Sequence, residues 1–127
     1  MANNFQISRN YVYENGTLRY TYQPNAINLP QATKGVNVQT ITFTTAEADI
    51  SVGTLGTPGR VVLHNLEPTT TGKTVNWGIK SSTGGLPKYH KLIAKDMAEA
   101  YYGTSDMVLR AKAASGTAIV QVIIWEA

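Results

Sequence analysis

The chain has 127 residues, and none of them is cysteine. This absence excludes disulfide bonds, thiolate metal ligands and thiol catalysis together. Because small secreted domains usually carry disulfides, it also favours folding in a reducing cytoplasm. A chain of this length buries roughly two-thirds of its unfolded surface without any cross-link. We therefore expect a single domain spanning residues 1–127.

No signal peptide and no long apolar run are visible in this sequence. Residues 1–5 contain neither the basic segment nor the apolar core of a signal peptide, so we expect no secretion by that route. No apolar run approaches the roughly 20 residues that a membrane-spanning helix needs. The sequence therefore predicts a protein that is made in the cytoplasm and does not enter a membrane.

The net charge of the chain is also small. Eleven Lys and Arg residues against eight Asp and Glu residues give a net charge of +3, and the basic residues are spread along the chain. One stretch carries four spaced lysines with no acid between them. No nucleic-acid-binding motif accompanies these lysines, so we expect no dedicated nucleic-acid binding. The four residues are Lys80, Lys88, Lys91 and Lys95.

Alternation of apolar and polar residues is the dominant pattern, and it is clearest near the N-terminus. Residues 5–13 and 17–22 both alternate, and Asn15-Gly16 lies between them. This dipeptide is typical of a type I′ hairpin turn, because both residues accept a positive φ. The sequence therefore predicts a hairpin with Asn15 and Gly16 as its two loop residues. The cross-strand pairs that follow are Glu14–Thr17, Tyr13–Leu18, Tyr11–Tyr20 and Arg9–Tyr22.

This register places the aromatic residues of the hairpin on one face, with Arg9 positioned for a cation–π contact with Tyr22. Three interpretations of the face stay open. The first is the hydrophobic core of the domain. The second is a protein interface, where tyrosine and arginine are enriched, and the third is a stacking platform for a sugar. The residues of the face are Tyr11, Tyr13, Leu18, Tyr20 and Tyr22.

The middle of the chain shows weaker patterns. Residues 1–4 are expected to be a flexible arm, and residues 23–35, with two prolines and little periodicity, a long loop. Strand character returns at residue 36 but changes phase near Gln39-Thr40, which indicates a bulge or a change of sheet. Residues 96–102 are expected to form a strand or, because Met, Ala and Glu favour helix, a helical turn.

The last segment, residues 117–125, is apolar on both faces. Such a strand is either covered by a second layer or presented to a partner. We expect Ala118, Val120, Val122 and Ile124 to share one face. The other face, together with the hairpin, supplies the predicted interface. Its residues are Arg9, Tyr11, Tyr13, Tyr20, Tyr22, Ile119, Ile123 and Trp125.

Nine to ten short strands separated by turns, with little or no helix, predict an all-β fold. The expected architecture is a two-sheet antiparallel β-sandwich of jelly-roll-like form.

Residues that bear chemistry do not combine into a site. His64 and His90 are the only histidines, and no ligand spacing joins them to a carboxylate. Glu47 and Asp49 share a strand face, which is typical of the solvent side of an edge strand and only rarely of a catalytic carboxylate pair. We therefore expect no enzyme, no catalytic residue, no bound metal and no cofactor.

The second half of the chain, about residues 50–127, resembles a group of small all-β virion structural proteins of tailed bacteriophages. A strand ending in Asn-Leu, a short Val-x-x-Gly strand and a Leu-x-Ala-x-Ala strand before a final apolar strand recur there in this order. Where that group commonly carries an acidic residue after Gly, this chain has Lys95-Asp96. The matching segments are GRVVLHNL at 59–66, VNWGI at 75–79, residues 92–100, LRAKA at 109–113 and the closing strand to Trp125-Glu126.

The resemblance implies a β-sandwich that binds a capsid or tail lattice and self-associates, and it brings no catalytic residues. It implies assembly into a virion in the host cytoplasm. The expected partners are the major capsid protein or other virion proteins, and a second copy of the chain. Capsid decoration is the leading expectation. A tail, neck or head-fibre component is the alternative, and a carbohydrate-binding β-module is the second alternative.

Overall fold

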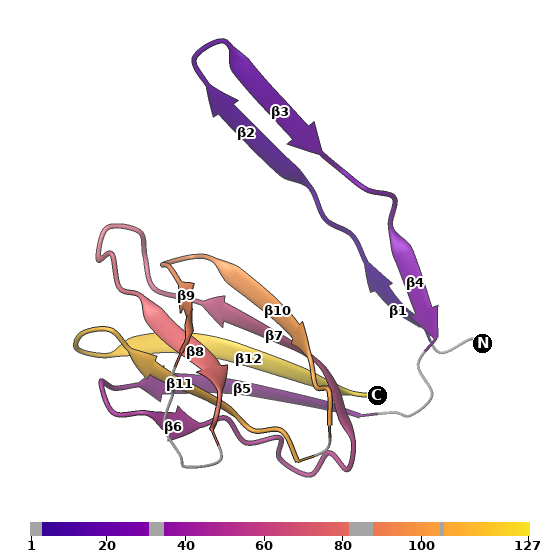
Figure 1. The fold of residues 1–127 in the computed structure, drawn as a ribbon, viewed down its shortest axis with the longest axis vertical. Coiled ribbons are helices and arrows are strands. Elements are labelled where there is room, and N and C mark those ends of the chain that lie inside the picture. The colour runs from indigo at the N-terminus through magenta and orange to yellow at the C-terminus, as the bar shows by residue number, and fades with distance from the viewer. Residues whose placement is uncertain (1–3, 31–34, 82–87, 105) are drawn as a thin grey trace. The chain divides into compact units, whose positions relative to one another are not determined.

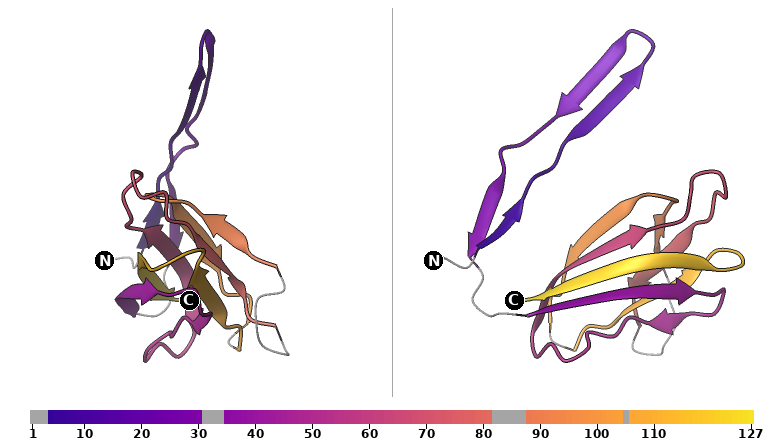
Figure 2. Two further views of the ribbon diagram at one scale, coloured as in Figure 1. Left: turned by 90° about the vertical axis from the view of Figure 1, so that its left-hand side faces the viewer. Right: turned by 180° about the vertical axis from the view of Figure 1, so that it is seen from behind.

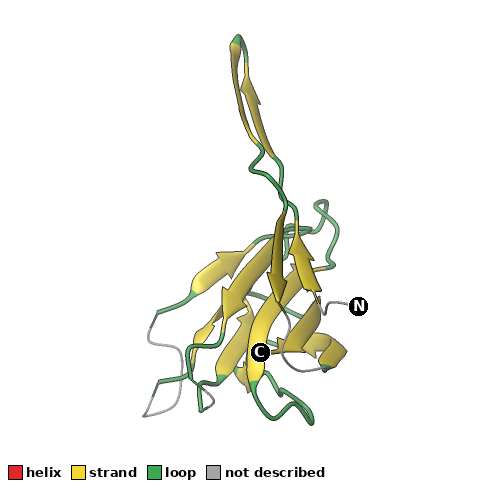
Figure 3. Ribbon diagram, turned by 90° about the vertical axis from the view of Figure 1, so that its right-hand side faces the viewer, coloured by secondary structure: helices red, strands yellow, loops and turns green. Residues whose placement is uncertain are grey.

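The structure is a computed structural model that describes residues 4–30, 35–81, 88–104 and 106–127. Every regular element in these residues is a β-strand and none is a helix (Figure 3). The expectation of an all-β fold is therefore confirmed. The chain separates into two compact units, Met1–Thr33 and Lys34–Ala127, which are described one at a time.

The N-terminal unit is a two-stranded ribbon made of two successive antiparallel ladders (Figure 1). Strand β1 (Asn4–Ile7) pairs with β4 (Ile27–Pro30), and β2 (Tyr11–Asn15) pairs with β3 (Leu18–Tyr22). Residues 8–10 join the ladders on one side and residues 23–26 on the other. The second connection is one residue longer and contains Pro24, which has no N–H to offer a ladder.

The predicted hairpin is present, but its turn lies one residue further along than expected. Gly16 and Thr17 are the loop residues, and the positive φ of 60° at Gly16 fits a type II′ turn, which needs Gly at its first central position. The expected pairing of Arg9 with Tyr22 is therefore wrong. Because each partner moves by two residues, the same side chains still share one face. The observed pairs are Asn15–Leu18, Glu14–Arg19, Tyr13–Tyr20, Val12–Thr21 and Tyr11–Tyr22.

Two boundary expectations also need correction. The stretch 23–35, predicted to be a loop, contains β4, which is recruited by pairing with β1. Asn4, expected in a flexible arm, begins β1, and residues 1–3 and 31–34 lie outside the described residues. The β-sandwich does not extend over 1–127, because its two sheets contain only strands that follow Gly35.

The second unit is a two-sheet antiparallel sandwich (Figures 1 and 2). One sheet, the β12 sheet, has the order β10-β7-β12-β5, and the other, the β11 sheet, has the order β6-β11-β8-β9. The described residues therefore hold twelve strands in all, more than the nine or ten expected. The sandwich strands are β5 (Val36–Phe43), β6 (Ala48–Asp49), β7 (Pro58–Asn65), β8 (Val75–Ile79), β9 (His90–Leu92), β10 (Met97–Tyr101), β11 (Leu109–Ala113) and β12 (Ala118–Glu126).

The pairing of these eight strands is nested. The first strand pairs with the last, the second with the second-last, and so on inwards: β5 with β12, β6 with β11, β7 with β10 and β8 with β9. Two further pairings, β7 with β12 and β8 with β11, assemble these hairpins into the two sheets. The chain thus follows the path of one long antiparallel hairpin that has been folded over on itself.

The core lies between the two sheets and is built from alternate residues of their strands, which point inward. Ala118, Val120, Val122 and Ile124 of β12 are fully buried, as expected from the last segment. They pack with Val61 and Leu63 of β7, Val75 of β8, and Leu109 and Ala111 of β11 in one hydrophobic cluster.

The expected bulge at Gln39-Thr40 is absent, because β5 pairs with β12 without interruption from Val36 to Phe43. The change of phase in the sequence has a different origin. Val36 and Val38 point outward and are more than half exposed, whereas Phe43 points into the core. The alternative of a helical turn at 96–102 is also wrong, since β10 forms a regular ladder with β7.

Asn65 is a fully buried polar residue at the end of β7. Its side-chain amide donates to the carbonyl oxygens of Lys73 and Leu92, at 3.1 Å each, and its Oδ1 accepts from the backbone N–H of Glu67 at 3.0 Å. Its backbone N–H and C=O bond to Asp96 and Lys95. The residue therefore ties the end of β7 to three neighbouring segments.

Candidate functional site

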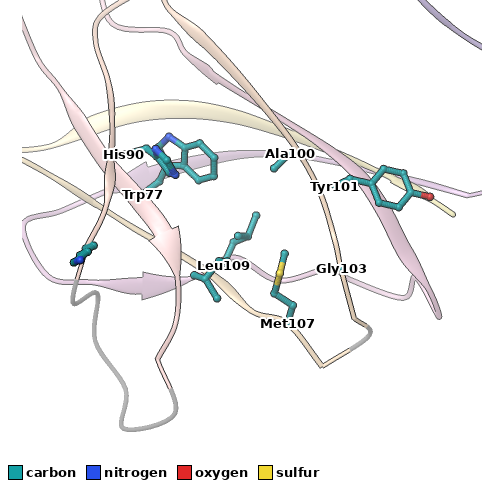
Figure 4. Close-up of a pocket in the computed structure, with 9 residues that line it drawn as sticks. Trp77, His90, Ala100, Tyr101, Gly103, Met107 and Leu109 are labelled. Atoms are coloured by element: carbon teal, nitrogen blue, oxygen red, sulfur yellow. The ribbon is translucent and has the colours of Figure 1, made fainter.

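The sandwich contains a hollow between its two sheets, of about 500 Å³. It lies where β8 and β9 of the β11 sheet approach β10 of the β12 sheet (Figure 4). The lining is mostly apolar, with a few polar groups. Its residues are Trp77, Ile79, Lys88, His90, Ala100, Tyr101, Gly103, Met107 and Leu109.

The polar groups of this hollow do not converge. The imidazole of His90 lies against the indole of Trp77, with ring centroids 5.0 Å apart and planes inclined by 36°. The ring of Tyr101 points away from the other labelled side chains (Figure 4), and the guanidinium of Arg60 lies over it at 5.7 Å. The hollow can receive an apolar group. The hollow depends on the closeness of β8 to β10, which belong to different sheets, so no local sequence pattern indicates it.

The aromatic face predicted for the hairpin is present on β2 and β3. We call Tyr11, Tyr13, Leu18, Tyr20 and Tyr22 the tyrosine face; each exposes more than half of its surface. The first of the three interpretations, that these residues form the core, is therefore wrong. The ribbon has two strands and no second layer of its own to cover them. The rings of Tyr11 and Tyr22 are 6.5 Å apart and inclined by 37°, so this pair does not form one flat platform.

Arg9 lies in the break between the two ladders. It lines a hollow of about 400 Å³ together with two cross-strand pairs, Ile7–Ile27 and Tyr11–Tyr22. The extra residue of the second connection shifts the register by one between the two ladders, as a β-bulge does. The apolar pair of one ladder and the aromatic pair of the other border the same hollow. Ile7 and Ile27 of the β1–β4 ladder therefore extend the tyrosine face along the ribbon.

The remaining predicted interface residues lie on the outer face of the β12 sheet. Ile119 is 40% exposed, while Ile123 and Trp125 are half-buried, and all three point away from the core, as expected. The register places Val38 beside Ile123 and Val36 beside Trp125. Ile119 is separated from these two pairs by the polar pair Gln121–Thr40. We call the five apolar residues together the outer patch. That it contacts a partner stays a prediction.

The pair Glu47 and Asp49 is engaged in ion pairs at the β6 edge of the β11 sheet. Arg110 Nε donates to Asp49 Oδ1 at 2.7 Å, and its Nη1 lies 3.3 Å from Glu47 Oε2. Lys80 Nζ adds a contact of 3.2 Å to Asp49 Oδ2. Hydrogen bonds from Arg110 and then Lys80 lower the pKa of Asp49. These ion pairs favour the charged form of Asp49 over a proton donor.

The two histidines lie on different sheets. His64 is on β7 of the β12 sheet and His90 is on β9 of the β11 sheet. Within the described ranges, no group of three or more His, Asp or Glu residues is placed to hold a metal ion. The described residues also contain no helix long and apolar enough to cross a membrane.

Comparisons with protein-family models, with curated proteins and with solved structures find no match to this chain. Two surfaces stand out in the described residues: the tyrosine face of the ribbon and the outer patch of the sandwich.

Proposed function

We propose that this chain is a structural protein of a bacteriophage virion, of the capsid-decoration type. It binds the major capsid protein at many equivalent positions of the lattice, where repeated weak contacts become strong through multivalency. It assembles onto the particle in the host cytoplasm and associates with further copies of itself. The observation that carries the proposal is the exposed tyrosine face on a ribbon that has no core of its own.

The energetics of the ribbon support a docking role. A two-stranded hairpin is marginally stable in water, because it lacks a second layer on which to bury its apolar side. Here four tyrosines and a leucine are more than half exposed on one such hairpin. Tyrosine is enriched at protein interfaces, since it buries much area at a low entropic cost. A partner that covers the face would supply the missing layer.

The strand order of the sandwich also supports the proposal. An eight-stranded jelly roll is a long antiparallel hairpin folded into two four-stranded sheets. The nested pairing of the eight sandwich strands, from β5 to β12, fits that description. Viral capsid domains use this architecture, and so do lectins. The resemblance of residues 50–127 to small virion proteins of tailed phages points to the first of these two groups.

Two other roles use the same surfaces. A tail, neck or head-fibre component would bind a small ring of positions instead of the whole capsid. Mass spectrometry of purified particles separates these roles, because decoration requires hundreds of copies and a neck or tail position requires six or twelve. A carbohydrate-binding module would use the tyrosines as stacking platforms, and a glycan array with Tyr20→Ala as the control variant tests it.

The direct test is co-sedimentation of the purified chain with particles of the virus that encodes it. We expect the wild-type chain to sediment with the particles. The double variant Tyr13→Ser with Tyr20→Ser should bind about tenfold more weakly or worse, since it removes one facing aromatic pair. The matched control is Val12→Ser with Thr21→Ala, the adjacent pair on the opposite face of the same ribbon, and it should bind normally. A chain that stays monomeric and does not bind assembled capsids contradicts the proposal.

A further inference from the structure

Among the described residues the sandwich has four edge strands, and one of them differs from the rest. Strand β5 has eight residues, VNVQTITF, with no charge and no proline. The other edges are short or charged: β6 has two residues and carries Asp49, β9 has three and carries Lys91, and β10 has five and carries Glu99. Natural sheets usually protect their edges with such short or charged strands, because an open edge pairs with other chains.

The backbone of β5 presents alternate residues to this open edge. The N–H of Glu126 on β12 donates to the carbonyl of Gly35, whereas the carbonyl of Thr44 is bonded on the opposite side, by Ala113 of β11. Backbone groups of successive residues point to opposite sides of a strand. The N–H and C=O groups at positions 36, 38, 40 and 42 therefore point away from β12.

The side chains at these positions leave the edge accessible. Val36 and Val38 are 54% and 57% exposed, and Thr40 and Thr42 are exposed as well. The loop at 50–56 reaches β5 on its inner side, where Gln39 Nε2 donates to the carbonyl of Ser51. Within that loop, the backbone N–H of Ile50 donates to the carbonyl of Leu109 and the N–H of Leu55 donates to the carbonyl of Val52.

We propose that β5 pairs in antiparallel fashion with β5 of a second copy of this chain. The two copies are related by a two-fold axis, so the contact is isologous. The pairing joins two four-stranded β12 sheets into one continuous sheet of eight strands. The outer patches of both copies then lie on the same side of that sheet, related diagonally across the two-fold axis.

The sequence of β5 is complementary to itself in one register. Placing Val36 opposite Thr42 and Val38 opposite Thr40 uses all four outward positions of each strand. Four hydrogen-bonded pairs with two bonds each give about eight backbone hydrogen bonds. Each cross-strand pair joins two β-branched residues, and no like charges meet, because the strand has none. The neighbouring two-fold registers, centred on residue 38 or 40, form only three such pairs.

This edge contact rests on the proposed function, because it specifies how the chain self-associates. It can be tested separately from binding to the particle. A chain that dimerises through β5 but does not bind capsids would overturn the capsid role alone. A chain that binds capsids as a monomer would overturn the edge contact alone.

Sedimentation of the wild-type chain is the first measurement, because it requires no variant. We expect a dimer that dissociates on dilution. A monomer at all concentrations, or a trimer or ring, overturns the proposal.

Cysteine cross-linking then determines the register of the two β5 strands. Because the chain has no native cysteine, only the introduced residues can form a disulfide. In the proposed register, residues 38 and 40 of opposite copies have Cα atoms about 5.5 Å apart, which suits a disulfide. An equimolar mixture of Val38→Cys and Thr40→Cys should form the mixed disulfide in preference to either homodimer. Ile119→Cys is the control, since it lies on the same outer face one strand further in. Preferential cross-linking through position 119 would indicate face-to-face packing and overturn the edge contact.

Thr40→Pro tests the backbone contribution. The N–H of residue 40 points to the open edge, so proline there leaves the ladder with β12 intact, a placement that edge strands tolerate. We expect a monomer with an unchanged β-sheet circular dichroism spectrum, and we expect Thr40→Val to remain a dimer. A folded Thr40→Pro variant that dimerises like the wild type overturns the proposal. If Thr40→Pro does not fold, the cross-linking experiment decides. Cross-linking of Val38→Cys to a different virion protein, with the wild type monomeric, would assign the edge to that protein instead.

Discussion

The sandwich and the ribbon use the same alternating sequence pattern and arrive at opposite results. On β12, alternate residues such as Val120 and Val122 lie under a second sheet and are fully buried. On β2 and β3, alternate tyrosines point to one side of a ribbon that has no second layer, and they remain exposed. Alternation determines which side chains share a face. It does not determine what covers that face. The sandwich covers its inward faces with its own second sheet, whereas the tyrosine face of the ribbon needs a partner.

The largest difference between the two regions should appear at their asparagines. Asn65→Ala removes three side-chain hydrogen bonds and leaves their partners without an acceptor or donor inside the sandwich. We expect the free energy of unfolding to fall by about 3–5 kcal/mol. Asn28→Ala, at an exposed position of β4, should change it by less than about 0.5 kcal/mol. Urea titration of both variants measures these free energies. A similar loss of stability in the two variants would contradict the difference between the two regions.

Apolar truncation should give the next largest contrast. Val122→Ala removes two methyl groups from a fully buried position and leaves a cavity, so we expect a loss of about 2 kcal/mol. Tyr20→Ala removes a much larger side chain, but from an exposed face, and should leave the unfolding of the sandwich within about 0.5 kcal/mol. Thermal denaturation followed through the tryptophans is a suitable measurement, because Trp77 and Trp125 both lie in the sandwich.

Positive φ angles allow a smaller comparison. Lys95 has φ of 68°, which costs a non-glycine residue about 1–2 kcal/mol. Lys95→Gly relieves this cost but increases the entropy of the unfolded chain. We therefore expect the sandwich to gain about 0.5–1 kcal/mol. Gly16→Ala places a side chain at a second positive φ, in the turn of the ribbon, and the free energy of unfolding of the sandwich should not change. Loss of stability in Lys95→Gly would contradict the account of this position.

Acid should distinguish the ion pairs of the two regions. The pKa of Asp49 lies below its ordinary value of 3.8 because Arg110 and Lys80 bond to its charged form. A lowered pKa in the folded state stabilises the fold above pH 3.8 and loses this contribution as the pH falls below it. Asp49→Asn should therefore flatten the acid limb of the stability profile of the sandwich. The ribbon pair Glu14–Arg19 is far more exposed, and Glu14→Gln should leave that limb unchanged. An unchanged limb in Asp49→Asn would contradict this role.

Local chemistry predicted much of the fold, and the errors occur where pairing between distant segments decides. Alternation located the hairpin and the inward face of β12 correctly. The turn was misplaced by one residue because Gly16 suits either turn type, and the ladder chose between them. Strand β4 was missed because residues 27–30 become a strand only by pairing with β1.

The candidate sites show the same division. The sequence identified the tyrosine face and the outward residues of β12, since both follow from local alternation. It misinterpreted Val36 and Val38 as one side of a bulge, because nothing local shows that they point to the outer face of an edge strand. The hollow at Trp77 was not predictable either, because its walls come from strands of different sheets.

Amide hydrogen exchange of the whole chain tests most directly the claim that the sandwich is self-sufficient while the ribbon needs a partner. At concentrations where the chain is monomeric, we predict slow exchange in β7 and β12 and fast exchange in β2 and β3, since opening a two-stranded ribbon costs little. Addition of capsid particles should then slow the exchange of β2 and β3. Protection of the ribbon equal to that of β12 in the free monomer would contradict the account.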